Sequence, residues 1–341
     1  MKILHAADLH VGCCRRYPDS LKRARLVFRD ILRIVKAHRC EFLVVSGDWF
    51  DRPTPNHEER ALVAELFKRC PVPIVSITGN HDKWGRDFGQ TALNWLTGLA
   101  PKFGHRVWDE PAGEEFGGVW WIALPYNDWS AVEQHLLTRY YLDQIPEDWE
   151  GPVVALAHEF FQGALLDSGF TGTSDKYAKL HTFANEVTYW ALGDIHKMQK
   201  MGSNAWYPGA PYQTSFGEAL PKGVLVVDLG KKKRPEFVEI TSPRAMIELT
   251  EVPEEWPDAY VKLTVRPEDL PHPLPPCVVQ IGSTSLPQDS QEIKDVHAMV
   301  SAKFLLQGMR SYLEKTKGWD EKMVKRGMRF ARDLVKKVQP E

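Results

Sequence analysis

The sequence predicts an α/β protein whose main sheet contains parallel strand pairs. Over the first eighty or so residues, short apolar runs alternate with stretches in which apolar side chains recur at helical spacing. This alternation is typical of parallel strands joined by helices. The chain has 341 residues, of which 43% are apolar and 26% charged, so it is long enough to bury a sizeable core.

The expected elements of this first part follow one another closely. The apolar run at 3–7 predicts a buried strand, and 20–38 has the periodicity of a helix. Residues 41–46 contain an uninterrupted run of Phe, Leu and two Val, which is typical of a strand buried on both faces. A second helix is expected over 58–69 and a third strand over 73–78.

The rest of the chain divides by composition. Further strands are expected over 119–124, 152–157, 187–192, 223–228 and 236–240, and a helix over 130–142. A proline-rich stretch from 250 to 290 has strand candidates at 260–265 and 277–281, and a helical pattern follows. We therefore expect a large domain over 1–243, a small β-rich domain over 244–288 and a helical segment over 289–341.

Charge and cysteine content exclude several classes of protein. A net charge of −2 excludes bulk electrostatic attraction to nucleic acid, so binding to nucleic acid would need local basic patches. The five cysteines contain no C-x-x-C pair, which disfavours a zinc ribbon and favours a reducing compartment. No apolar stretch approaches the length of a membrane span, and the first residues do not resemble a signal peptide. We expect a cytoplasmic protein without membrane contact.

Five polar segments stand at the ends of apolar runs. They are Asp8-Leu9-His10, Gly47-Asp48-Trp49-Phe50-Asp51, Gly79-Asn80-His81-Asp82, His158-Glu159 and Gly193-Asp194-Ile195-His196. Open α/β sheets place their sites at the carboxyl ends of strands, so these segments are expected to converge. Asp, Asn and His side chains suit divalent ions such as manganese. Two such ions would suggest phosphoester hydrolysis, because metal binding lowers the pKa of water to about 7.

Each of these residues also has an ordinary structural explanation. An isolated Asp8 or Asp51 could be a helix cap or a turn residue, and His158 alone could be a hydrogen-bonded core histidine. For Asp51 we favour a role in bracing its loop. Glu159 could face the site or point away from it. It is the joint occurrence of the five segments that favours the metal site.

In this order the segments resemble the calcineurin-like metallophosphoesterases and, within them, the SbcD-type nucleases. The family pattern is D-x-H, G-D-x-x-D, G-N-H-D, a later single His and G-H-x-H, and the likeness extends over about residues 1 to 240. It includes 206–210 and 215–218. The resemblance implies a β-sandwich flanked by helices, a small β-rich capping domain over 244–288 and C-terminal helices over 289–341.

The resemblance also implies roles for particular residues. The implied metal ligands are Asp8, His10, Asp48, Asn80, His158 and His196, with Asp48 shared between two ions. His81 is expected beside the scissile phosphate, where it stabilises or protonates the leaving oxygen. Asp82 is expected to orient the His81 ring.

One position departs from the family pattern. Asp194 stands where most relatives have a histidine. Aspartate can still bind the second ion, so Asp194 is retained as an expected ligand. Its negative charge is expected to make that ion a weaker Lewis acid.

The evidence for substrate and partners is less direct than the evidence for the metal site. The basic residues close to the motifs that could neutralise a phosphate backbone are Arg15, Arg16, Lys83, Arg86, Lys197 and Lys200. Trp49, Phe50 and Trp84 could stack on a base or simply pack their loops. Residues 301–341 contain eleven Lys/Arg and five Asp/Glu, which fits either a solvated helix face or a docking appendage.

The resemblance implies two divalent ions, with Mn²⁺ preferred and Mg²⁺ as the alternative, and DNA as the substrate. It further implies an SMC-like ATPase partner of the SbcC type and a homodimer within a heterotetramer. Two other classes remain open. One is a stand-alone phosphoesterase acting on a nucleotide or a phosphoprotein, and the other is a scaffold that has lost catalysis.

Overall fold

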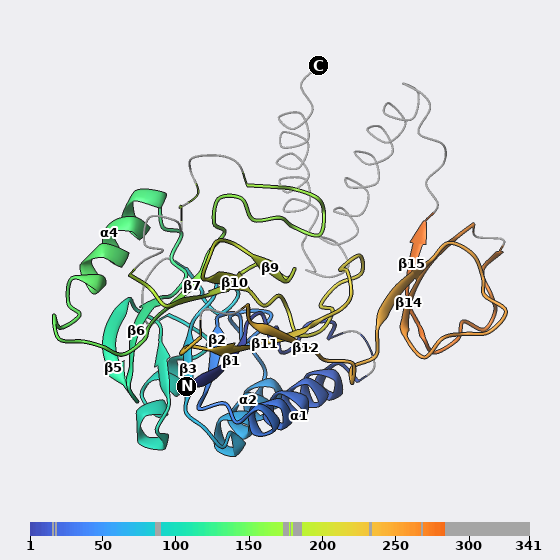
Figure 1. The fold of residues 1–341 in the computed structure, drawn as a ribbon. Coiled ribbons are helices and arrows are strands. Elements are labelled where there is room, and N and C mark those ends of the chain that lie inside the picture. Colours follow the sequence, from blue (N-terminus) through green and yellow to red (C-terminus); the bar gives the residue numbers. More distant parts are fainter. Residues whose placement is uncertain are drawn as a thin grey trace, which may run out of the picture. The chain divides into compact units, whose positions relative to one another are not determined.

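Two six-stranded sheets form the main body of the computed structural model (Figure 1). The structure describes residues 1–15, 17, 19–85, 90–172, 177, 179, 186–231, 234–266 and 269–283. The first sheet has the order β12-β11-β1-β2-β3-β4 and the second has the order β5-β6-β7-β8-β10-β9. The predicted α/β sandwich is therefore confirmed.

The first sheet is parallel at its centre. Its strands are β1 (Lys2–Ala6), β2 (Phe42–Ser46), β3 (Ile74–Ile77), β4 (Arg106–Trp108), β11 (Gly223–Asp228) and β12 (Glu236–Glu239). β1 to β4 pair in parallel, whereas β11 is antiparallel to β1 and to β12. Because successive side chains of a strand point to opposite faces, β2 sends Val44 toward the second sheet and Leu43 toward the helices.

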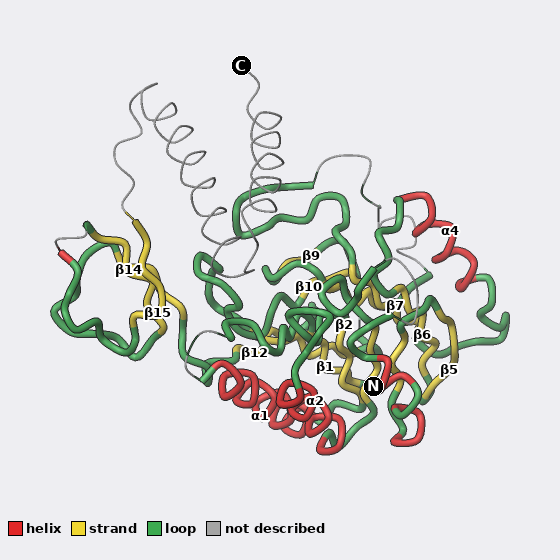
Figure 2. The backbone as a smooth tube through the Cα atoms, turned by 180° about the vertical axis from the view of Figure 1, so that it is seen from behind, coloured by secondary structure: helices red, strands yellow, loops and turns green. Residues whose placement is uncertain are grey.

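Two helices cover the outer face of the first sheet. α1 (Ser20–His38) and α2 (His57–Arg69) lie next to each other on this face in both views (Figures 1 and 2). α2 begins one residue before its predicted start because Asn56 and Glu59 form a reciprocal capping box. Both predicted helices are confirmed.

The second sheet is also parallel at its centre, and one helix covers it. Its strands are β5 (Ala112–Phe116), β6 (Val119–Leu124), β7 (Val153–His158), β8 (Tyr189–Gly193), β9 (Gln199–Lys200) and β10 (Ala205–Tyr207). β6, β7, β8 and β10 pair in parallel with one another, whereas the edge strands β5 and β9 are antiparallel to β6 and β10. α4 (Ala131–Leu142), capped by Ser130, packs on this sheet, and short turns α3 (Asn94–Thr97) and η1 (Ala100–Phe103) precede β4. The strands that sequence reasoning missed are mostly short or polar, so they carry little apolar periodicity.

A third, three-stranded sheet follows. It contains β13 (Met246–Leu249), β14 (Tyr260–Val265) and β15 (Val278–Ser283), of which β13 was not predicted. Gln213 exchanges two hydrogen bonds with the Met246 backbone, at 2.8 and 3.0 Å, and so ties β13 to the large domain. The buried Arg23 guanidinium donates to the carbonyls of Gln213 and Arg244. The small sheet is thus held to the chain's first helix.

Residues Met1–Gly282 form one compact unit, and a second unit begins at Ser283. The expected boundaries at 243/244 and 288/289 stay predictions, and the predicted C-terminal helices lie outside the described residues. Among the residues that the structure describes, no helix has the length and apolar character needed to cross a membrane.

Candidate metal centre

The loops that follow β1, β2, β3, β7 and β8 bring the five polar segments together. The backbone N–H of Asp8 donates to the Gly47 carbonyl (3.2 Å), and that of His10 donates to the Asp48 carbonyl (3.0 Å). The Asp194 N–H donates to Asp8 Oδ1 (3.0 Å). Loops from both sheets are therefore joined at one edge of the sandwich.

Four residues of these loops have strained backbones. Asp8, His10, Asp48 and Asp194 have φ angles of 54°, 39°, 52° and 96°. A non-glycine residue in this region costs about 1–3 kcal/mol, and such strain collects at functional sites. The hydrogen bonds between the loops hold the chain in this conformation.

Two glycines of the motifs are required by close approach. A Cβ atom at Gly79 would overlap the Asp48 carboxylate, and one at Gly193 would overlap the Ser46 carbonyl. Both glycines therefore allow the β3 and β8 loops to reach the Asp48 loop.

Asp48 lies between two histidines at the centre of the cluster. Its Oδ2 atom is 3.4 Å from His10 Nε2 and 3.4 Å from His158 Nε2. The Nε2 atoms of His10 and His196 are 3.0 Å apart. Within the described part of the chain, three sets of His and carboxylate donors lie within 4.8 Å of one another, namely Asp8/His10/His196, His10/Asp48/His81 and Asp8/Asp48/His158. These sets share members, as expected of two ions with a common carboxylate.

The donors themselves indicate that metal ions fit here. Asp8 Oδ2 is buried and has no hydrogen-bond partner among the described residues. A buried carboxylate oxygen without a partner is costly, and a bound cation would satisfy it. Two imidazole nitrogens that face each other at 3.0 Å likewise suit a shared cation. The cluster is therefore a site for divalent metal.

On the other side of Asp48, Asn80 and Asp194 flank His158. Asn80 Oδ1 is 3.0 Å from His158 Nε2, and Asp194 Oδ1 is 3.9 Å from the same nitrogen. Asp194 is not a member of the tight donor sets found among the described residues. Burial raises the pKa of Asp194 to about 6, and the charges of Asp48 and Asp8 add to the rise while His158 opposes it.

Each histidine of the cluster is oriented through its far nitrogen. The Nδ1–H of His158 donates to the Ser46 carbonyl (2.7 Å), which leaves Nε2 facing Asp48. His10 Nδ1 is 3.5 Å from Asp51 Oδ1, so the Asp51 carboxylate lies beside an expected metal ligand. His196 Nδ1 lies 3.2 Å from Glu218 Oε1.

Glu218 was not assigned a role from the sequence. Its Oε2 atom is 2.7 Å from Lys222 Nζ, and Lys222 also donates to the His196 carbonyl (2.9 Å). Burial would raise the pKa of Glu218, but the hydrogen bond from His196 and the Lys222 ammonium hold it well below its usual range. The i, i+4 spacing of Glu218 and Lys222 could have predicted their ion pair, but not their contact with a histidine 22 residues earlier.

The predicted pairing of Asp82 with His81 is wrong. The Asp82 carboxylate accepts hydrogen bonds from the backbone N–H groups of Trp49 (3.2 Å), Phe50 (3.0 Å) and Gly79 (2.9 Å). It is fully buried and so braces two loops. The His81 Nδ1–H instead donates to the Asp51 carbonyl (2.9 Å), and the His81 backbone N–H donates to Asp48 Oδ1 (2.9 Å).

The histidines and carboxylates of the cluster shift one another's pKa values. Burial would lower the pKa of His10, but the neighbouring Asp51 carboxylate and the charges of Asp48 and Asp8 raise it to about 9. His158 is likewise raised well above its ordinary pKa, mainly by Asp48 against the effect of burial. Burial would raise the pKa of Asp48, yet His158 and His10 hold it well below its usual range.

Only some of the residues predicted to contact nucleic acid are exposed in the structure. Lys83 is buried, and its Nζ donates to the Tyr126 carbonyl (3.1 Å) and Asn127 Oδ1 (2.5 Å), so it is not free to bind phosphate. Trp49 and Phe50 are fully buried and pack their loops, whereas Trp84 is half-exposed. Arg15 and Lys200 are exposed and Lys197 is half-buried. Arg16 and Arg86 lie outside the described residues.

Comparison with known proteins identifies the class. Residues 1–198 match the family model of the calcineurin-like phosphoesterases, and the chain belongs to that family. It is 26% identical over 304 residues to the SbcD subunit of the SbcCD nuclease of Escherichia coli K12, a match that covers 76% of this chain and 74% of that protein. The SbcD subunit of Staphylococcus epidermidis is 24% identical over 252 residues, covering 67% of this chain and 66% of its own.

A further relative is the DNA double-strand break repair protein Mre11 of Archaeoglobus fulgidus, 24% identical over 275 residues. That match covers 70% of this chain and 59% of the relative, so the chain spans between 59% and 74% of these three proteins. Among solved structures, a dimetal phosphatase from Danio rerio matches with a TM-score of 0.40 and 13% identity, covering 66% of this chain and 91% of that one.

Proposed function

We propose that this chain is a metal-dependent phosphodiesterase that cuts DNA. The observation that carries the proposal is the position of Asp48, which is 3.4 Å from His10 on one side and from His158 on the other. A carboxylate shared in this way suits two ions held close together. The names of the relatives, which are nucleases and a double-strand break repair protein, support DNA as the substrate.

The residues divide into two ligand sets around Asp48. Asp8, His10 and His196 would hold one ion, and Asn80, His158 and Asp194 would hold the other. Mixed oxygen and imidazole donors favour Mn²⁺, with Mg²⁺ as the alternative. When bound, the ions would supply Lewis acidity and a water of lowered pKa.

His81 is proposed as the residue that serves the leaving group. Because its Nδ1–H donates to the Asp51 carbonyl, its Nε2 atom is the nitrogen left to meet the phosphate. In the imidazolium form, Nε2 would donate a proton to the leaving oxygen. The Asp51 carbonyl, rather than Asp82, would orient this ring.

The assembly is proposed from the relatives. We infer a capping role for 244–288 and an ATPase-docking role for 289–341, with an SMC-like ATPase as partner and a homodimer within a heterotetramer. The exposed Arg15 and the half-buried Lys197 are the remaining candidates for phosphate contact close to the metal ligands. A cytoplasmic location is part of the same proposal.

One observation favours a second candidate. Because Lys83 is engaged inside the protein, one of the expected phosphate contacts is lost among the residues that the structure describes. This favours a stand-alone phosphoesterase that acts on a nucleotide or a phosphoprotein. A non-catalytic scaffold is disfavoured by the nearly intact ligand set.

An assay with end-labelled DNA and Mn²⁺ tests the proposal. We expect Asp48→Ala to lose more than about 100-fold of the activity, since it removes the shared ligand. His81→Ala is expected to lose about 100-fold or more with Mn²⁺ binding retained. His57→Ala, which changes an exposed histidine at the start of α2, is the matched control and is expected to behave as wild type.

The outcomes separate the candidates. If wild type and both site variants cut DNA equally, the proposed site is wrong. Turnover of bis(p-nitrophenyl) phosphate without cleavage of DNA would favour the stand-alone phosphoesterase. Failure of the wild-type chain to bind Mn²⁺ in calorimetry would favour the scaffold.

A further inference from the structure

Helix α4, which covers the second sheet, presents apolar side chains to solvent (Figure 1). Val132, Leu136 and Tyr140 are 68%, 61% and 61% exposed, whereas the buried positions of the same helix include Gln134 and Thr138. A helix on the surface of a soluble protein normally turns its apolar side chains to the core and its polar ones to water. The polarity of α4 is inverted at these positions, so a large apolar surface is open to solvent.

The inward position of Gln134 costs free energy. Both polar atoms of its side-chain amide are buried, and neither has a hydrogen-bond partner among the described residues. The Thr138 hydroxyl donates to the Gln134 backbone carbonyl (2.7 Å) and leaves the side-chain amide unsatisfied. An unpaired buried amide costs about 1–3 kcal/mol. The stability of the domain therefore does not explain why the polar side chains of α4 are inside and the apolar ones outside.

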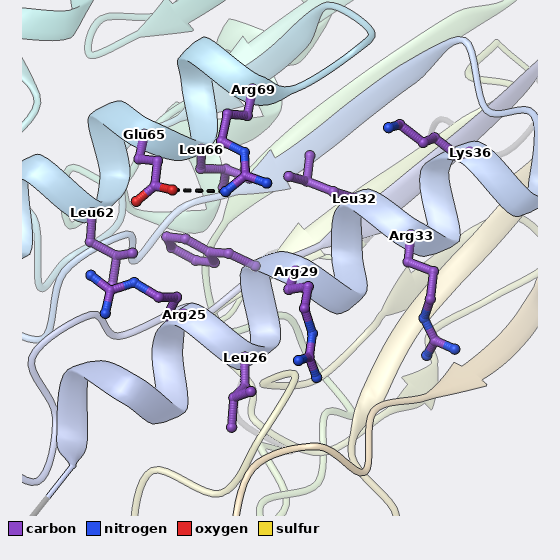
Figure 3. Close-up of a pocket in the computed structure, with 11 residues that line it drawn as sticks. Arg25, Leu26, Arg29, Leu32, Arg33, Lys36, Leu62, Glu65, Leu66 and Arg69 are labelled. Atoms are coloured by element: carbon purple, nitrogen blue, oxygen red, sulfur yellow. Dashed lines mark hydrogen bonds and ion pairs between the residues drawn. The ribbon is translucent and has the colours of Figure 1, made fainter.

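The helices that cover the first sheet have the usual polarity. Leu62 and Leu66 of α2 are 3% and 2% exposed and belong to the core, whereas Arg29 and Arg33 of α1 are exposed beside the groove between these two helices (Figure 3). Water thus meets charged side chains on α1 and apolar ones on α4. The inverted polarity is a particular property of α4.

The spacing of the exposed side chains suits another helix. Val132, Leu136 and Tyr140 stand at i, i+4 and i+8, so they form one continuous row along α4. Rows of this spacing are the ridges that fit into the grooves of a second helix, with the two axes crossing at about 50°. Contiguous exposed apolar side chains of this kind mark interaction surfaces, whereas single ones do not.

The surroundings of this row are acidic. Residues 128–150, which contain α4 and the turn after it, include six Asp/Glu and a single Arg with no Lys. That arginine, Arg139, is already paired with Asp143 (2.8 Å) and Glu186 (2.7 Å). Three exposed acidic residues of the turn have no ion pair among the described residues, namely Glu147, Asp148 and Glu150. A partner of this surface would therefore meet negative charge around an apolar row.

We propose that the exposed face of α4 binds a basic, amphipathic helix of a partner protein. The apolar side chains of that helix would pack on Val132, Leu136 and Tyr140, and its Lys or Arg residues would meet the carboxylates of the turn. Apolar anchors supply affinity in this mode of recognition, and the flanking charges select the partner. None of these residues belongs to the metal centre, so the surface is separate from the proposed phosphodiesterase site.

Charge disfavours two other occupants. A second copy of the chain would bring two acidic surfaces together, which is repulsive. The phosphates of nucleic acid would be repelled by the same carboxylates. The row is apolar and its surroundings are acidic, and a basic helix with an apolar stripe matches both.

The test uses synthetic peptides and the full-length chain. The first probe is a fluorescent peptide of about 18 residues with Leu at i, i+4, i+7 and i+11 and Lys on either side of this stripe. The second carries Glu in place of every Lys. We expect the basic peptide to bind, by fluorescence anisotropy, at least about tenfold more tightly than its acidic counterpart.

A first pair of variants tests the apolar row. Leu136→Ser with Tyr140→Ser is expected to weaken the basic peptide by about tenfold or more, because two exposed anchors are lost. Phosphodiesterase turnover should stay unchanged, since both side chains are exposed and distant in sequence from the metal ligands. The matched control is Leu99→Ser with Phe103→Ser, which removes exposed apolar side chains outside α4 and should change binding by less than about threefold.

A second pair tests the charges. Glu147→Lys with Glu150→Lys is expected to weaken the basic peptide by about tenfold or more, because attraction becomes repulsion. Glu251→Lys with Glu254→Lys changes the net charge equally, at two exposed residues of the small domain with the same spacing. This control should weaken binding by less than about threefold.

Four results would overturn the proposal. Equal binding of the basic and acidic peptides would show that charge selects nothing, and equal losses in a variant and its control would show that α4 is not the site. Dissociation of a dimer by Leu136→Ser with Tyr140→Ser in analytical ultracentrifugation would assign the face to a second copy. The chain's own basic end, 301–341, lies outside the described residues. A tenfold gain in peptide affinity on Val324→Glu with Met328→Glu would assign the face to that end.

Discussion

The two sides of the metal centre differ in how their charges are compensated. On the His196 side, the neighbouring carboxylate Glu218 has Lys222 at 2.7 Å and is held ionised, with its pKa well below the usual range. On the His158 side, burial raises the pKa of Glu159 to about 8, and Glu159 Oε2 has no hydrogen-bond partner among the described residues. Asp194 on the same side has a pKa raised to about 6.

This difference has a chemical consequence. On the His196 side the charge of the bracing carboxylate is already compensated, because Lys222 pairs with Glu218, which in turn contacts the far nitrogen of His196. The His158 side contains excess buried carboxyl groups, whose charge is best compensated by a bound cation. We therefore expect the first side to depend on its bracing residues and the second to depend on Asp194.

Replacing Asp194 is expected to have the larger effect. Asp194→Ala should weaken the binding of one of two Mn²⁺ ions by about a hundredfold or more, because a charged ligand is lost from the His158 side. Asp194→His should retain both ions, since imidazole is also a suitable ligand. Calorimetric titration with Mn²⁺ measures the number of ions and their affinities. Two ions bound by Asp194→Ala with unchanged affinity would mean that Asp194 is not a ligand.

Replacing Glu218 is expected to affect the His196 side. Glu218→Gln keeps the shape but loses the charge that accepts from His196 and binds Lys222, so Mn²⁺ affinity should fall by about ten- to a hundredfold at one site. The matched control is Glu65→Gln, which breaks an exposed ion pair far from the cluster and should leave affinity unchanged. A loss of thermal stability with normal Mn²⁺ affinity would instead make Glu218 a purely structural residue.

The pH dependence of metal binding gives a smaller difference between the sides. The metal-free His10 has a pKa raised to about 9, so it is protonated at neutral pH and must release a proton to bind metal. Mn²⁺ affinity should thus fall as the pH drops below about 9. Below about pH 6, Asp194 is protonated as well, and the fall should steepen by up to about tenfold per pH unit.

Asp194→Asn distinguishes the two contributions. It cannot titrate, so the steeper fall below about pH 6 should disappear while the dependence between about pH 6 and 9 is kept. Mn²⁺ dissociation constants measured from about pH 5 to 9 provide the comparison. The same slope in the acidic range for wild type and variant would contradict the shifted pKa of Asp194.

Much of the fold was predictable because its long elements carry strong periodicity. The helices at 20–38 and 58–69 and the central strands were found within one or two residues of their observed bounds. β5 and β9 were missed because Ala-Gly-Glu-Glu-Phe and a two-residue strand have no apolar pattern. Their pairing is imposed by neighbouring strands, which is a property of the whole sheet.

The metal cluster was predictable for a related reason. Its ligands follow buried parallel strands, and the carboxyl ends of such strands meet at one edge. The order and spacing of the motifs were therefore enough to predict that Asp8, Asp48 and His158 lie together.

The local sequence could not predict contacts between segments that lie far apart in the chain. Asp82 turns its carboxylate to three backbone N–H groups because burial penalises any unpaired N–H, and that demand exists only once the β2 and β3 loops are packed. Glu218 reaches His196, and Lys83 is withdrawn from the surface, through the same kind of packing. The ligand types and strand ends thus followed from the sequence, whereas the partner of each polar group was decided by desolvation in the folded chain.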